Sequence, residues 1–374
     1  MRIGIEAQRI FRAKKHGMDI FALQLIKNLQ AVDLENEYFI FVKSGPDRDC
    51  LEETENFKIV ELRGFTYLDW EQIALPIAVK KMKIEVLHCT SNTAPLFVNV
   101  PTVLTIHDVI YLTSKDAHKG TWYQTLGHYY RKWVVPAVAK KAKKIVTVSN
   151  FELQSMREHI HNPNISYIYN GVADCFFKYT YGDRPYGLPE KYLFFLGNLA
   201  HKKNMKNLLK AYAWYVDQVS EPIPLVVAET SRRELHQLFD ELNVWSIQPF
   251  VKLVGYVPQP FLPALYYHAT LFIYPSLFES FGIPILEAMA CGTPVITSSY
   301  TAMPEVAGDC ALKVETKDFI KLGGAIKYLL EDDQLREKLR TEGISRSQNF
   351  RWTNAAKSYL DLYGPSTVRA KLSA

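Results

Sequence analysis

Residues 276–294, SLFESFGIPILEAMACGTP, form the stretch that decides the fold. Apolar runs at Leu271–Tyr274 and 294–297 flank it, so the pattern predicts a β-α-β unit. Glu279 and Glu287 stand eight positions apart, slightly more than two helical turns, so both can face one cleft at the carboxyl ends of the strands. Taken singly, Glu279 could equally cap a turn and Glu287 could be a solvated position on an amphipathic helix.

The start of this predicted helix has the composition of an anion site. Ser280 is a suitable N-cap, and Gly282 lets the backbone approach a ligand closely. The amides of Phe281, Gly282 and Ile283 would then point out of the helix N-terminus, where unpaired N–H groups carry a partial positive charge. The pattern predicts a phosphate-binding site at the helix start.

The composition fits two α/β domains, each with a buried core. The chain has 374 residues, of which 48% are hydrophobic, so it lacks the signature of a disordered protein. Its formal net charge of +5 requires no nucleic-acid partner and suits an anionic substrate or a lipid surface. The five cysteines include no C-x-x-C pair, and no window reaches the roughly 18 apolar residues of a membrane span. We therefore expect a cytoplasmic protein that is soluble or associated with the inner face of a membrane.

Short apolar runs alternate with helical patterns along the chain. Further strands are predicted at 2–6, 38–42, 57–61, 86–89, 102–106, 144–148, 165–169, 192–196, 224–228 and 251–253. Helices are predicted at 19–29, 68–81, 121–143, 149–160 and 318–342, with a last one at 351–363. This alternation indicates mostly parallel sheets.

Three polar side chains follow strand ends, where parallel sheets bind ligands. His107 ends the strand VLTIHD, and an imidazole there can donate to a sugar hydroxyl or exchange protons near neutral pH. A satisfied loop pair with Asp108 is the alternative. Lys202 and Lys203 lie in GNLAHKKN, where an ammonium can neutralise a departing diphosphate. A solvated basic face is the alternative for the two lysines.

The helix expected at 121–143 is basic and aromatic. Its aromatic residues are Trp122, Tyr123, Tyr129, Tyr130 and Trp133, interleaved with His128, Arg131 and Lys132. Such stripes usually pack in a core. An exposed share could instead contact an acceptor sugar or an anionic bilayer.

Together these motifs resemble the family-four retaining glycosyltransferases, among the group 1 glycosyltransferases, which have the GT-B fold. The resemblance covers nearly the whole chain, with denser motifs in its second half. It implies two doubly wound Rossmann-like α/β domains, at 1–180 and 186–350, which face each other across a cleft. A linker is expected at 177–189, and residues 351–374 are expected to form a C-terminal helix that returns to the N-terminal domain. The acceptor would bind mainly to the first domain and the donor to the second.

The same resemblance implies roles for particular residues. Gly17 would approach the donor diphosphate, and 254–258 would lie beside the nucleobase. Asn198 and Lys203 match a turn in which the family has an arginine or a small polar residue and then a lysine, so the missing arginine is a departure. The expected site residues divide by role: Glu287 for the ribose, Glu279 with the amides after Ser280 for sugar and phosphate, Lys203 with Lys202 for the leaving group, and His107 for orienting the sugar.

The resemblance implies transfer, with retention, of a hexose from a GDP-mannose or UDP-hexose type of nucleotide-sugar donor. The acceptor would be a glycan or a lipid-linked sugar in bacterial surface polysaccharide synthesis. Two alternatives stay open: a nucleotide-sugar epimerase of the same fold, and a catalytically silent scaffold subunit. Asp47-Arg48-Asp49 has the D-x-D spacing of a metal site but follows Ser44-Gly45-Pro46 in a polar loop, so no metal and no other cofactor is expected.

Overall fold

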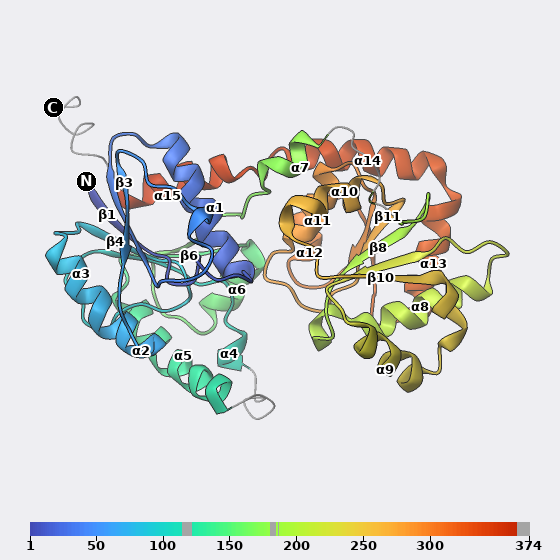
Figure 1. Ribbon diagram of the computed structural model, residues 1–374, viewed down its shortest axis with the longest axis horizontal. Coiled ribbons are helices and arrows are strands. Elements are labelled where there is room, and N and C mark those ends of the chain that lie inside the picture. Colours follow the sequence, from blue (N-terminus) through green and yellow to red (C-terminus); the bar gives the residue numbers. More distant parts are fainter. Residues whose placement is uncertain (114–121, 180–184, 186, 365–374) are drawn as a thin grey trace. The chain divides into compact units, whose positions relative to one another are not determined.

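The computed structural model describes residues 1–113, 122–179, 185 and 187–364. The chain divides into two compact units: Met1–Asn170 with Trp352–Ala374, and Gly171–Arg351. Each unit has its own sheet with helices around it (Figure 1). Among the described residues, none of the helices combines the length and the apolar character that crossing a bilayer requires.

The first unit is built on a seven-stranded parallel sheet in the order β3-β2-β1-β4-β5-β6-β7. Its strands are β1 (Arg2–Glu6), β2 (Glu37–Val42), β3 (Phe57–Glu61), β4 (Val86–Cys89), β5 (Thr102–Thr105), β6 (Lys144–Thr147) and β7 (Ile165–Tyr167). Its helices are α1 (Gly17–Val32), α2 (Tyr67–Asp69), α3 (Leu75–Lys81), α4 (Ile110–Thr113), α5 (Trp122–Lys141), α6 (Asn150–Arg157) and α15 (Trp352–Tyr363). The strand order reverses direction between β1 and β4, which makes this the switch point of the sheet.

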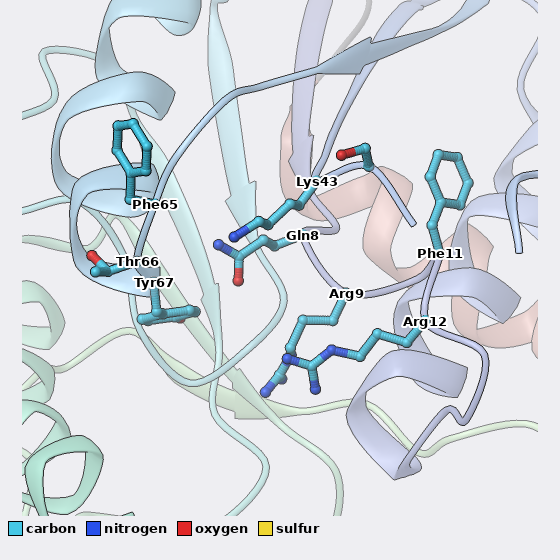
Figure 2. A pocket seen from close by; sticks show the side chains of 9 residues that line it. Gln8, Arg9, Phe11, Arg12, Lys43, Phe65, Thr66 and Tyr67 are labelled. Carbon is cyan, nitrogen blue, oxygen red and sulfur yellow. The ribbon is translucent and has the colours of Figure 1, made fainter. Parts of the chain in front are cut away.

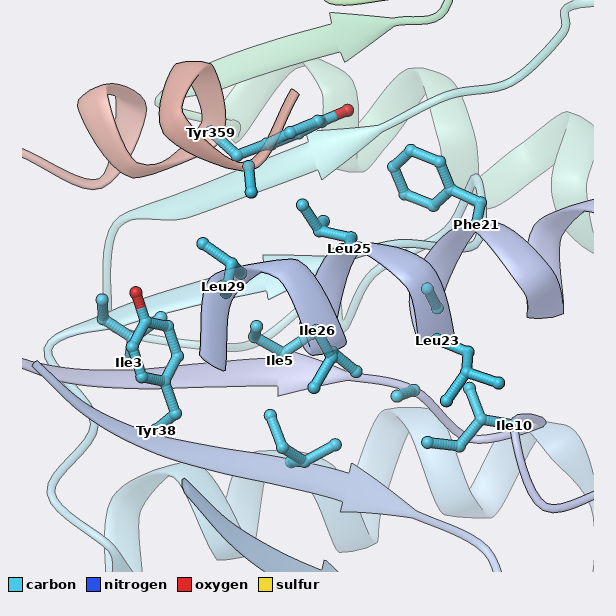
Figure 3. Close-up of a cluster of buried hydrophobic side chains, with 14 of the residues drawn as sticks. Ile3, Ile5, Ile10, Phe21, Leu23, Leu25, Ile26, Leu29, Tyr38 and Tyr359 are labelled. Atoms are coloured by element: carbon cyan, nitrogen blue, oxygen red, sulfur yellow. The ribbon is translucent and has the colours of Figure 1, made fainter. Parts of the chain in front are cut away.

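Alternating side chains of β2 show why helices cover both faces of this sheet. Tyr38 and Ile40 belong to one buried cluster, whereas Phe39 and Phe41 belong to another. Successive side chains of a strand point to opposite faces, so the two clusters lie on opposite sides. The first cluster packs under α1 and α15 (Figure 3), and the second contains apolar residues of α3, α5 and α6.

The last helix belongs to the first unit although it follows the second unit in the chain. Trp352 and Tyr359 of α15 pack edge-on against Phe21 of α1, with ring centroids 5.6 and 5.9 Å apart. The hydroxyl of Tyr363 lies 2.8 Å from Nδ1 of the buried His88. The expected return of the C-terminal helix to the first domain is confirmed.

The second unit has a six-stranded parallel sheet in the order β10-β9-β8-β11-β12-β13. Its strands are β8 (Leu193–Leu196), β9 (Leu225–Ala228), β10 (Val251–Gly255), β11 (Leu271–Tyr274), β12 (Val295–Ser298) and β13 (Leu312–Val314). Its helices are α7 (Asp174–Lys178), α8 (Met205–Asp217), α9 (Arg232–Leu242), α10 (Leu262–Tyr267), α11 (Ile283–Ala290), α12 (Met303–Ala307), α13 (Phe319–Glu331) and α14 (Asp333–Ser347). Here the switch point lies between β8 and β11.

The division between the units falls earlier than the sequence predicts, after Asn170 instead of at 180. Val172 donates its N–H to the carbonyl of Phe350 at 2.8 Å, and a guanidinium nitrogen of Arg351 lies 3.6 Å from Asp174. These contacts join the segment after Asn170 to the second unit. The expected linker at 177–189 therefore begins inside α7, and its residues 180–184 and 186 lie outside the described residues.

The short elements α7, α9, α10, α12 and β13 were not expected from the sequence. Helices α7, α10 and α12 have five or six residues and β13 has three, so their apolar periods are too short to stand out. Helix α9 has 11 residues and begins with a capping box of Ser231 and Glu234, a signal that the sequence did offer.

Candidate functional site

The candidate site lies at the switch point of the second sheet, where the loops after β8 and β11 meet. The N–H of Leu277 donates to the carbonyl of Lys202 at 2.7 Å. Asn204 donates from Nδ2 to the carbonyl of Pro275 at 3.0 Å and to that of Thr316 at 2.8 Å. The two loops are thus tied together at the edge where open α/β sheets bind ligands.

An ion pair connects these loops. Nζ of Lys203 lies 2.6 Å from Oε1 of Glu279 and 2.9 Å from the hydroxyl of Tyr274, the last residue of β11. Burial raises the pKa of Glu279, but the charges of Lys203 and Lys202 outweigh it and hold that pKa below its usual value. Glu279 is therefore an anion, and Lys203 is a positioned cation with donor capacity left for a ligand.

Asn204 holds Lys203 in place, and sequence reasoning did not assign it a role. It adopts the left-handed conformation, with φ 59°, between the 3₁₀ turn His201–Lys203 and α8. Asparagine tolerates this conformation better than most residues, and its buried amide supplies the two bonds to Pro275 and Thr316. An asparagine directly after two lysines, before a helix, was the available signal.

The prediction that Ser280 is the N-cap of this helix is wrong. Helix α11 begins at Ile283, and Gly282 is its N-cap, with φ 100° and ψ 49°. Glycine alone adopts such a backbone without strain, so the helix starts two residues later than a serine cap would allow. Pro284 has no N–H, and within the described part of the chain the amides of Gly282 and Ile283 make no hydrogen bond. The N–H groups of Gly282 and Ile283 remain the candidates for holding an anion.

Phe281 is buried by its side chain. The residue is 4% exposed, and its ring lies 6.0 Å from the ring of Phe350, centroid to centroid. This packing anchors the loop before α11 to the segment that follows α14.

Glu287 is buried instead of solvated. It is 7% exposed, and the hydroxyl of Tyr266 donates to its Oε2 at 3.1 Å. Burial raises the pKa of Glu287 to about 7, although the bond from Tyr266 works in the opposite direction. A carboxyl group that titrates near neutrality inside a protein is a candidate functional group.

Thr301 is strained and contacts the site, and nothing in the sequence indicated it. It follows β12 with φ 54°, which is unusual for a β-branched residue, and its Oγ1 accepts from the N–H of Glu279 at 3.2 Å. Backbone strain of this kind persists where the surroundings hold it, often at functional sites.

The remaining predicted residues of the second unit lie at the surface of the same edge. Asn198 and Lys202 are exposed, and Oδ1 of Asn198 accepts from the N–H of Ala200 at 3.0 Å. In the segment 254–258, Gly255 has φ 69° and no atom near the place of a Cβ. Glu229, not predicted, donates its N–H to the carbonyl of Gly255 at 2.8 Å and orders this loop.

His107 follows β5 in the first unit, with 9% exposure. Its Nε2 lies 2.9 Å from the carbonyl of Thr90, and its ring meets Phe21 edge-on at 4.7 Å. Burial lowers the pKa of His107 to about 4, so the ring is neutral near pH 7. Because a carbonyl only accepts, Nε2 carries the proton and Nδ1 presents a lone pair. The geometry favours accepting from a hydroxyl over the expected proton exchange near neutral pH.

Gly17 is the first residue of α1. It belongs to the first unit, whereas Lys203, Glu279 and Glu287 belong to the second. A Cβ built on it would meet no atom within 4 Å. Internal packing therefore does not require glycine here, which leaves the close approach of a ligand as a reason for it.

A buried acidic network in the first unit was missed. Glu71 lies in the π-helical turn Trp70–Ala74 with 1% exposure, and its Oε2 accepts from Thr93 at 2.9 Å and from Tyr130 at 3.1 Å. Burial and then the charge of Glu6 raise the pKa of Glu71 to about 7. The helical pattern at 68–81 made Glu71 look like an ordinary helix residue.

Two family models together span most of the chain. Residues 184–346 match the model described as glycosyl transferases group 1, and residues 16–174 match glycosyltransferase family 4. O-antigen chain mannosyltransferase B of Escherichia coli is 30% identical over 275 residues, which are 70% of this chain and 69% of that protein. The chain belongs to the family 4, group 1 glycosyltransferases. This glycosyltransferase is also 26% identical to the Escherichia coli serotype-specific mannosyltransferase WbdA, over 69% of its own length but 33% of that of WbdA.

Solved structures share the fold of this glycosyltransferase. Sucrose-phosphate synthase from Thermosynechococcus elongatus matches with a TM-score of 0.73 and 22% identity, over 97% of this chain and 98% of that one. Anabaena HepE in complex with UDP and glucose matches with a TM-score of 0.74 and 18% identity, over 97% and 99%. The two Rossmann-like domains are those of the GT-B fold, as expected.

Proposed function

We propose that this glycosyltransferase moves a mannosyl or related hexosyl group from a nucleotide sugar to a glycan or lipid-linked acceptor in surface polysaccharide synthesis, with retention. The Escherichia coli relatives are mannosyltransferases, which favours GDP-mannose as the donor. HepE is described in complexes with UDP and UDP-glucose, which keeps a UDP-hexose as the second candidate donor.

The observation that carries this proposal is the Lys203–Glu279 pair beside the free amides of Gly282 and Ile283. The amides and Lys203 supply donors for a diphosphate, and Lys203 stabilises the charge that develops as the diphosphate leaves. Glu279 accepts from hydroxyls of the transferred sugar, and Glu287 accepts from the ribose. Lys202 and Asn198 lie on the same loop, and Lys202 adds a second cation near the leaving group.

The reaction is proposed as a front-face displacement. The bond between the anomeric carbon and the diphosphate oxygen breaks, and the acceptor oxygen bonds to the same face of that carbon. The acceptor proton passes to the departing diphosphate oxygen, so no protein base is needed. His107 is proposed to orient the sugar through its Nδ1 lone pair, and Gly17 to allow the diphosphate to come close to α1.

We also propose that no divalent metal takes part. The diphosphate charge has candidate partners in Lys202, Lys203 and the N-terminus of α11. In the D-x-D segment, Asp47 forms a salt bridge with Lys15, which gives this aspartate a structural use in its turn.

Peripheral contact with an anionic membrane is a further part of the proposal. Trp133 of α5 is 81% exposed, Tyr129 is 47% exposed, and Lys140 and Lys141 lie in the last turn. Exposed aromatic and basic side chains on one helix suit a headgroup region. Trp122 and Tyr123 belong to the same predicted aromatic stripe, and their side chains lie outside the part of the chain that the structure describes.

A donor screen tests the function. The protein is mixed with GDP-mannose, UDP-glucose or UDP-N-acetylglucosamine, and thermal stabilisation, transfer to an acceptor glycan and the anomeric configuration of the product are measured. We expect one donor to stabilise the fold and to yield a retained linkage. Formation of an epimerised nucleotide sugar without transfer would indicate the epimerase, and binding without turnover would indicate the scaffold.

A further inference from the structure

A pocket of about 200 Å³ lies at the carboxyl edge of the first sheet. Its lining comes from the loops that follow three neighbouring strands (Figure 2): Gln8, Arg9, Phe11 and Arg12 after β1, Lys43 and Ser44 after β2, and Phe65, Thr66 and Tyr67 after β3. None of the donor-site residues proposed above lines it.

The loops that frame the pocket are fastened to each other. Lys43 donates its N–H to the carbonyl of Gln8 at 3.1 Å, and Asp47 donates to that of Phe11 at 3.1 Å. A Cβ on Gly45 would come within 2.3 Å of the carbonyl oxygen of Phe11, so only glycine lets the second loop lie this close. The pocket is therefore a built feature of the fold.

The charge in the pocket is one-sided. Three cations line it, and the lining includes no aspartate or glutamate. Nε of Arg9 lies 3.1 Å from Asp19, whereas Arg12 and Lys43 have no carboxylate within ion-pair distance among the residues that the structure describes. Figure 2 shows both arginines and Lys43 directed into the same space. Arg12 and Lys43, the two cations without an ion-pair partner among the described residues, favour an anionic ligand.

Gln8 supplies a second, independent indication of a ligand. It is 6% exposed, and its side-chain amide has no hydrogen-bond partner in the described ranges, although it points toward the pocket with Lys43 (Figure 2). The amide atoms of Gln8 keep access to solvent through the pocket, and a ligand oxygen there would give this amide a partner.

We propose that this pocket binds a phosphate group carried by the acceptor substrate, an assignment that rests on the proposed glycosyl transfer. Guanidinium groups bind phosphate oxygens in pairs, and Lys43 and Gln8 add single donors. The donor diphosphate already has its candidate partners in the second unit, so a phosphate held here belongs to the other substrate. The ring of Tyr67, whose hydroxyl bonds to Thr93, lines the pocket as an apolar wall for the group next to the phosphate.

Binding of inorganic pyrophosphate to the full chain tests the pocket. Lys203→Ala serves as the background, because it weakens the anion site on the donor side. Calorimetry at constant low ionic strength compares this variant with the triple variant that also carries Arg12→Gln and Lys43→Gln. We expect the Lys203→Ala chain to bind pyrophosphate and the two added changes to weaken this binding at least tenfold. Lys81→Gln serves as the control, because Lys81 is exposed at the end of α3 and does not line the pocket. It should leave the affinity unchanged.

A short-chain prenyl diphosphate and glucose 1-phosphate distinguish the sources of the phosphate. Tighter binding of the prenyl diphosphate identifies a lipid-linked acceptor, and tighter binding of the sugar phosphate identifies a phosphorylated sugar. Either affinity should fall at least tenfold in the Arg12→Gln, Lys43→Gln chain with Lys203 intact.

Two results would overturn the assignment. One is unchanged pyrophosphate affinity after the two pocket changes in the Lys203→Ala background. The other is an equal loss of nucleoside diphosphate affinity when Arg12 and Lys43 alone are changed, since that would place the donor in the pocket. A failure of the proposed function would appear differently, as absent nucleotide-sugar turnover in a wild-type chain that still binds pyrophosphate through Arg12 and Lys43.

Discussion

Lys203 and Glu279 form a largely buried ion pair across the switch point of the second sheet, with Nζ 2.6 Å from Oε1 and side chains 19% and 13% exposed. Lys203 comes from the loop after β8 and Glu279 from the loop after β11. A diphosphate that enters this edge meets a cation already held in position, so little reorganisation is needed when charge develops.

Lys203→Ala should lower turnover by about 2 to 4 kcal/mol of barrier, the range typical of losing one electrostatic stabiliser. Binding of the intact donor should fall less, because the charge on the diphosphate is greatest as it leaves. Steady-state kinetics and donor calorimetry measure the two effects. Lys206→Ala, which changes an exposed lysine paired with Glu241, is the matched control. Equal losses in affinity and turnover would favour a simple binding lysine.

Glu287→Ala should weaken binding of the nucleoside diphosphate about tenfold, since one hydrogen-bond acceptor lost from a buried site costs roughly 1 to 3 kcal/mol. The pKa of Glu287 is about 7, so its carboxyl is partly protonated at neutral pH. Ribose hydroxyls donate to the ionised form, and affinity should therefore rise between about pH 6 and pH 8. Calorimetry across this range should show a larger rise in the wild type than in Glu287→Gln, in which the terminal phosphate of the ligand still titrates. An equal rise in both proteins would remove Glu287 from the ribose site.

His107→Ala should reduce turnover while the affinity for the nucleoside diphosphate stays near that of the wild type. The reason is that His107 belongs to the first unit, whereas Lys203 and the amides of Gly282 and Ile283, the proposed donors to the diphosphate, belong to the second. The pKa of His107 is about 4, so His107 should contribute no step near pH 6.5 to the pH profile of turnover. The wild type and His107→Ala should therefore have profiles of the same shape in this range. A large fall in affinity for the bare nucleotide would place His107 in a different role.

Glu71 predicts a pH-dependent stability. Its folded-state pKa of about 7 lies above its ordinary value, so the folded state holds a proton that the unfolded chain loses. The free energy of unfolding should consequently decrease as pH rises from about 5 to 8, by up to roughly 3 kcal/mol from this group. Denaturant unfolding of the wild type and Glu71→Gln isolates the contribution. The decrease should be smaller in Glu71→Gln, and identical slopes in the two proteins would show that Glu71 titrates normally.

Metal independence gives the last prediction. Activity should survive excess EDTA and the double change Asp47→Asn with Asp49→Asn, since cationic side chains and helix amides are proposed to meet the diphosphate charge. The double change removes the salt bridge from Lys15, so thermal unfolding is measured alongside turnover. Loss of activity on chelation, restored by magnesium or manganese, would require withdrawing this part of the proposal.

The sequence alone determined the elements whose patterns are local. Alternating apolar runs and helical periods indicated two parallel-sheet domains, and the spacing in 276–294 indicated an anion site before a helix. The serine cap was wrong because capping propensity cannot show that Gly282 takes φ 100°. Lys203 was predicted as a site residue because its loop follows a strand, and it stays a prediction that the ion pair with Glu279 supports.

The tertiary structure alone decided which distant residues meet. The order β3-β2-β1 brings three loops together around Gln8, Arg12 and Lys43, and no local period encodes that order. In the same way, the adjacency of β8 and β11 places Lys203 against Glu279. Burial then shifts the protonation of Glu71 and Glu287, because a carboxylate loses its hydration only once the surrounding chain has packed around it.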